Sequence, residues 1–80
     1  MKNNLLIEIR RAIHDFMIRM DVLASHGELN SDGAKALFRI LRMMKESGMK
    51  SEASRLLRSM KKRDMEDIAI VLREIEERLS

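Results

Sequence analysis

The first 26 residues of this 80-residue chain carry apolar side chains at alternating intervals of three and four. The stripe consists of Leu6, Ile9, Ile13, Phe16, Met20 and Leu23. This spacing keeps the apolar side chains on one face of a helix that packs along its neighbours, as in helical bundles. It predicts a long helix over residues 3–26, which Gly27 would end.

Shorter apolar stripes in the rest of the chain predict three more helices. Their expected bounds are residues 31–47, 51–62 and 64–79. Asn30 or Ser31 can accept hydrogen bonds from the first turn of the second helix, so either would serve as its N-cap.

The boundary between the last two helices depends on a break in the apolar phase. Met60 and Met65 are five residues apart, which interrupts the helical repeat. We therefore expect a tight turn near Arg63, with Asp64 as the N-cap of the last helix. A single continuous helix over residues 51–79 is the alternative.

Composition supports an all-α protein with a single domain over residues 1–80. The chain has no Pro and only three Gly, which disfavours a many-turned β protein. Eighty residues suffice for one hydrophobic core. The predicted fold is a small bundle of four amphipathic helices with a long first helix. The chain shows no apolar run of membrane-spanning length and no signal peptide, so we expect a cytoplasmic protein with no membrane partner.

The predicted first helix carries a second set of apolar residues outside its stripe. Ile7, Ile18 and Val22 fall among charged residues on another side of the helix. One small core cannot easily bury both sides, which favours a homodimer with these residues at its interface. The alternatives are that the later helices cover them or that they are simply exposed.

Charge is distributed unevenly along the chain. Residues 31–63 hold ten basic and three acidic side chains, whereas residues 64–80 hold two basic and six acidic ones. On the two middle helices, basic residues recur away from the apolar stripe. These ridges consist of Lys35, Arg39 and Arg42 on the second helix and Arg55, Arg58 and Lys62 on the third.

The two basic ridges suggest a nucleic-acid-binding surface. Lys and Arg would neutralise phosphates and release counterions. The first functional hypothesis is therefore a non-enzymatic, dimeric, nucleic-acid-binding regulatory protein. Alternatively, the basic residues form an ordinary solvated face or pair with the acidic last helix. The chain also lacks Trp and Tyr, on which the bases of a single strand could stack.

The second hypothesis is a small protein-binding adaptor, antagonist or chaperone. It would engage an acidic partner through the basic faces, or an amphipathic helix through a Met-lined groove. The eight Met residues equally suit a core that is poor in aromatic side chains.

Enzymatic and metal chemistry lack candidate residues. The chain has no Cys, and its two His residues, His14 and His26, are twelve positions apart with no carboxylate converging on both. No glycine-rich phosphate loop or nucleophile motif occurs. We therefore expect no catalytic site, no metal and no cofactor.

Overall fold

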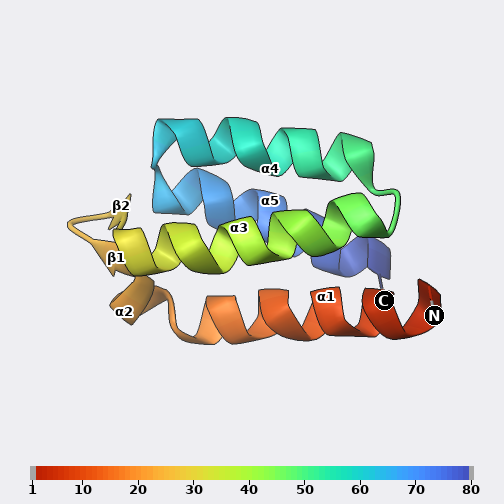
Figure 1. The fold of residues 1–80 in the computed structure, drawn as a ribbon. Coiled ribbons are helices and arrows are strands. Elements are labelled where there is room, and N and C mark those ends of the chain that lie inside the picture. The colour runs from red at the N-terminus through yellow and green to blue at the C-terminus, as the bar shows by residue number, and fades with distance from the viewer. Residues whose placement is uncertain (1, 80) are drawn as a thin grey trace.

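The computed structural model describes residues 2–79 and arranges four long helices side by side, each antiparallel to the next (Figure 1). Short elements lie between the first long helix and the second. The order is α1 (Lys2–Ile18), α2 (Met20–Leu23), β1 (Ala24–Ser25), β2 (Glu28–Leu29), α3 (Ser31–Glu46), α4 (Lys50–Lys62) and α5 (Met65–Leu79). The predicted all-helical class is thus largely correct, but the chain forms five helices and a small two-stranded sheet within residues 2–79 and not the four helices predicted.

The four long helices form a ring. α1 packs against α3 and α5, and α4 packs against the same two helices from the opposite side. The core lies between them and includes most of the predicted stripes. Its most completely buried side chains are Ile9, Ile13, Leu37, Ile40, Met44, Leu56, Ile68, Leu72 and Ile75.

The predicted single helix over residues 3–26 is wrong after Ile18. The chain leaves helical geometry at Arg19, whose φ and ψ are −101° and 19°, and resumes for only one turn in α2. A two-residue β-hairpin follows, with Ala24 paired to Leu29 and Ser25 to Glu28. The end of the stripe still contributes to the core because α2 packs against α3, with Leu23 buried and Met20 partly buried.

Gly27 belongs to the hairpin turn and does not end a helix. His26 and Gly27 have φ values of 55° and 78°. Positive φ at both central residues is the geometry of the two-residue turn that matches the twist of paired strands. His26 is therefore a residue of the hairpin turn.

Asn30 and Gly33 fix the hairpin to the start of α3. The Asn30 side chain caps α3 by accepting a hydrogen bond from Gly33 N at 2.8 Å. Its amide nitrogen also donates to the carbonyl of Val22 at 2.9 Å. A Cβ at position 33 would overlap the Leu23 carbonyl oxygen and the Leu29 Cδ1, so only glycine permits this approach.

The turn predicted near Arg63 is confirmed, and the continuous helix over residues 51–79 is wrong. Arg63 ends α4 in the left-handed region with a φ of 58°. Asp64 then caps α5, because its Oδ1 accepts a hydrogen bond from Glu66 N at 3.0 Å. None of the helices within residues 2–79 is long and apolar enough to cross a membrane.

Candidate functional site

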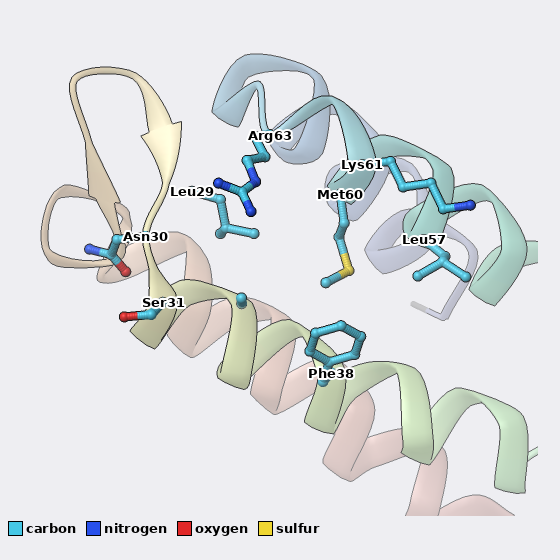
Figure 2. A pocket seen from close by; sticks show the side chains of 9 residues that line it. Leu29, Asn30, Ser31, Phe38, Leu57, Met60, Lys61 and Arg63 are labelled. Atoms are coloured by element: carbon cyan, nitrogen blue, oxygen red, sulfur yellow. The ribbon is translucent and has the colours of Figure 1, made fainter.

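A groove lies between α3 and α4 and begins at the hairpin (Figure 2). A hollow of about 610 Å³ lies at the hairpin end, and a second of about 370 Å³ lies farther along α4. Leu57 lines both hollows, so they adjoin at this residue, and we call the two together the α3/α4 groove.

The floor of the α3/α4 groove is apolar. Phe38 projects from α3 towards α4, while Leu57 and Met60 project from α4 towards Phe38 (Figure 2). Phe38 keeps 54% of its surface exposed, in contrast to Phe16, which is buried in the core. An aromatic side chain held in a groove with half of its surface in water is an available contact for a partner.

The sides of the α3/α4 groove are basic. Lys61 and Arg63 line the hairpin end, and Lys45 and Lys50 line the other end. No Asp or Glu lines either hollow among the residues that the structure describes. These four cations also form no ion pair with another residue between 2 and 79. The groove therefore combines an uncovered apolar floor with uncompensated positive charge.

The three basic residues predicted on the second helix lie on the outer side of α3. Lys35, Arg39 and Arg42 are all exposed. The buried face of α3 contains Leu37, Ile40 and Met44, among others, and helical periodicity places the three cations opposite that face. They form no ion pair within the described part of the chain.

The three basic residues predicted on the third helix lie beside α5. Arg55, Arg58 and Lys62 share a hollow with residues of α5. Arg55 binds Glu74 at 2.6 Å, and Lys62 Nζ lies 4.0 Å from Asp67 Oδ2. This side of α4 is not the one that faces the α3/α4 groove. The structure therefore brings each set of three together but separates the two sets.

The three residues predicted at a dimer interface are exposed. Ile7 and Ile18 lie on the outer side of α1, with 55% and 66% of their surfaces exposed. Val22 is also exposed, but it belongs to α2, beyond the break at Arg19. The later helices do not cover these side chains.

The two histidines lie in different parts of the structure. His14 Nδ1 lies 3.8 Å from Glu76 Oε2 on the outer surface, and His26 occupies the hairpin turn. No group of three or more potential ligands is placed to hold a metal ion within residues 2–79.

The α3/α4 groove is the feature that the sequence did not reveal. Phe38 stands next to the core residue Leu37 and looks like part of the apolar stripe. The sequence signal was that Phe38 lies one position after Leu37 and so outside the repeat of the buried residues. This offset turns the Phe38 ring away from the core and towards the edge of the helix face. The comparisons with known proteins find no family model, curated protein or solved structure that matches this chain.

Proposed function

We propose that this protein is a non-enzymatic protein-binding module that holds an acidic, amphipathic helix of a partner in the α3/α4 groove. One observation carries the proposal: a partly exposed apolar floor at Phe38 and Leu57 lies between cations, and no carboxylate from the described part of the chain lines the groove. Binding of a helix by a groove is a recurrent mode of peptide recognition.

The apolar floor would provide most of the affinity. Covering the exposed half of the Phe38 side chain contributes about 1 kcal/mol, since full burial of such a side chain contributes roughly 1.5–3 kcal/mol. Leu57 is partly buried and adds further apolar surface. Phosphate groups gain nothing from such a floor, which is why we favour a protein partner over a nucleic acid at this groove.

The cations would select the partner's charge. An exposed ion pair contributes only about 0–1 kcal/mol, so Lys45, Lys50, Lys61 and Arg63 would discriminate between partners more than they would hold them. On the partner's helix, acidic residues on both sides of the apolar stripe would face these four side chains. A basic helix would be repelled.

The length of the groove suits a short helix. Ala34 and Lys45 line its two ends on α3, and eleven residues of helix span about 16 Å, or roughly three turns. A partner would therefore present apolar anchors at positions i, i+3 or i+4, and i+7.

A designed peptide tests this proposal. The probe is a labelled amphipathic helix with Leu anchors at that spacing and Glu elsewhere, and its control has Lys in place of Glu. We expect the acidic peptide to bind and the basic one to fail, as measured by fluorescence anisotropy. Phe38→Ser should weaken binding at least fivefold, and Lys50→Glu with Lys61→Glu should do the same.

Two matched variants control for general surface effects. Ile70 is as exposed as Phe38, at 53%, but lies on α5, and Arg73 is an exposed cation on the same helix. Ile70→Ser and Arg73→Glu should leave peptide binding within a factor of two. Equal binding of both peptides, or no binding of the acidic one at high micromolar concentration, would refute the proposal.

Nucleic-acid binding is a second candidate function, favoured by a separate observation. Lys35, Arg39 and Arg42 are exposed on the outer side of α3 and carry no ion pair within the described residues. Three such cations could contact phosphates of a duplex backbone. Partial pairing of Arg55 and Lys62 with α5 leaves them less available for the same role.

The salt dependence of duplex binding tests this second candidate. Random-sequence DNA and RNA duplexes should bind at low salt with an affinity that falls steeply as salt increases, and Arg39→Ala with Arg42→Ala should flatten the slope. Arg55→Ala should change the slope less. Absence of any duplex binding at low salt would exclude it and leave the groove proposal unaffected.

A further inference from the structure

The outer side of α1 has two exposed isoleucines three helical turns apart. Ile7 and Ile18 are separated by eleven residues, which is about three turns and about 16 Å along the axis. Both therefore face the same way, away from the core. Between them lies a shallow hollow lined by α1 side chains alone, namely Ile7, Arg10, Arg11, His14 and Asp15.

We propose that this side of α1 binds the same side of α1 in a second copy of the chain, with the two helices antiparallel. In this arrangement Ile7 of each copy contacts Ile18 of the other. The contact is isologous, so it closes on itself and yields a dimer. The proposal does not depend on what binds the α3/α4 groove.

The charges between the two isoleucines favour the antiparallel orientation. When Ile7 lies opposite Ile18 of the second copy, Arg11 comes opposite the region of His14 and Asp15. Each copy thus places its Arg11 beside the other copy's Asp15, giving two opposite-charge pairs. An in-register parallel pair would instead place Arg11 against Arg11 and Asp15 against Asp15, which is repulsive.

The size of the contact indicates a weak dimer. One helix of seventeen residues offers a contact at the small end of the range for specific interfaces, below about 1,200 Å² in total. Val22 lies beyond the break at Arg19 and is not required for this contact. We therefore expect monomer at low protein concentration and dimer near millimolar concentration.

The dimer would leave both α3/α4 grooves accessible. α1 packs on α3 and α5, so its outer side lies across the bundle from α4. Two grooves in one dimer would allow simultaneous binding of two acidic helices, and hence avidity for a partner that carries two of them.

Sedimentation equilibrium, combined with a swap of the charged residues Arg11 and Asp15, tests the interface. Wild-type protein should dimerise with increasing concentration in sedimentation equilibrium, and Ile7→Ser with Ile18→Ser should remain monomeric. Both side chains are exposed, so this variant should keep its fold, and Ile70→Ser is the matched control that should still dimerise. Arg11→Asp should weaken the dimer at least tenfold, and adding Asp15→Arg should restore it.

Cysteine cross-linking tests the orientation, because the natural chain has no Cys. A mixture of Ile7→Cys and Ile18→Cys should form the mixed disulfide, since those positions would be adjacent. Neither variant alone should cross-link efficiently, because like positions would be about 16 Å apart and a disulfide needs Cα atoms within about 7 Å. A wild-type monomer at millimolar concentration, or preferential linking of like positions, would overturn the proposal.

Discussion

Leu29 and Arg63 are joined by a backbone hydrogen bond, in which the Leu29 N–H donates to the Arg63 carbonyl at 3.1 Å. The Met65 N–H donates in turn to the Gly27 carbonyl at 3.2 Å. The hairpin is thus attached to the turn between α4 and α5, although 34 positions separate Leu29 from Arg63. Leu29 and Arg63 both line the hairpin end of the α3/α4 groove, where the Arg63 side chain lies beside Leu29 (Figure 2).

Arg63→Gly should separate stability from binding. Arg63 adopts a left-handed backbone conformation, which costs a non-glycine residue about 1 kcal/mol and costs glycine almost nothing. We expect the variant to be more stable by about 0.5–1 kcal/mol in urea unfolding, because the same turn forms with less strain. Loss of a groove cation should nevertheless weaken binding of the acidic peptide. Lower stability would contradict this account of the turn.

Gly33→Ala should destabilise the protein. The added methyl group would overlap the Leu23 carbonyl oxygen, and backbone cannot move aside as a flexible side chain can. We expect a loss of about 2–3 kcal/mol in the free energy of unfolding, from overpacking between α2 and α3. Ser31→Ala, at an exposed position two residues earlier, should change stability by less than about 0.5 kcal/mol. A neutral Gly33→Ala would show that the hairpin is not packed so closely on α3.

Substitutions of Asn30 should distinguish its two hydrogen bonds. Asn30→Ala removes both the cap on Gly33 N and the donation to the Val22 carbonyl, and should cost about 1–2 kcal/mol. Asn30→Asp keeps the cap and loses only the donor, so it should retain part of the stability. Thermal unfolding of the three proteins checks the order. Equal losses in both variants would mean that the cap contributes nothing.

Ser59 and Asp67 should respond unequally to substitution. The buried Ser59 hydroxyl donates to Asp67 Oδ2 at 2.5 Å, whereas the Asp67 side chain is partly exposed to water. Ser59→Ala should cost at most about 1 kcal/mol, because water can replace the lost donor at the carboxylate. Asp67→Ala should cost about 1–3 kcal/mol, because it leaves a buried hydroxyl without its partner. A larger loss of stability for Ser59→Ala than for Asp67→Ala in urea unfolding would contradict the conclusion that the hydroxyl is buried and the carboxylate is accessible to water.

Local signals were enough to predict α3, α4 and α5 to within a residue or so at each end. Asn30 caps α3 and Asp64 caps α5 through contacts with residues only two or three positions away. The break at Arg19 had no such signal, since the apolar stripe continues through it to Leu23. After the single turn of α2, the hairpin takes the place of the predicted helix end, and it is held by the long-range bonds from Asn30 to Val22 and from Leu29 to Arg63.

The candidate site was less predictable because it depends on which helix lies on which side of α4. Arg58 and Leu57 are adjacent in sequence, yet Leu57 faces α3 and Arg58 faces α5. Periodicity places residues on faces of a helix, but it does not say which neighbour covers each face. The charge concentration in residues 31–63 was visible from sequence, whereas its division between the groove, the outer side of α3 and the side of α5 was not.

Mapping the bound peptide on the protein tests the central claim most directly. Backbone amide chemical shifts of the labelled protein would be followed by NMR during titration with the acidic amphipathic peptide. The groove proposal predicts that the largest changes cluster at Ala34, Phe38, Leu57 and Lys61, with little change at Arg11 or Arg73. Changes centred on the outer side of α1 or on α5, with the groove unaffected, would contradict it.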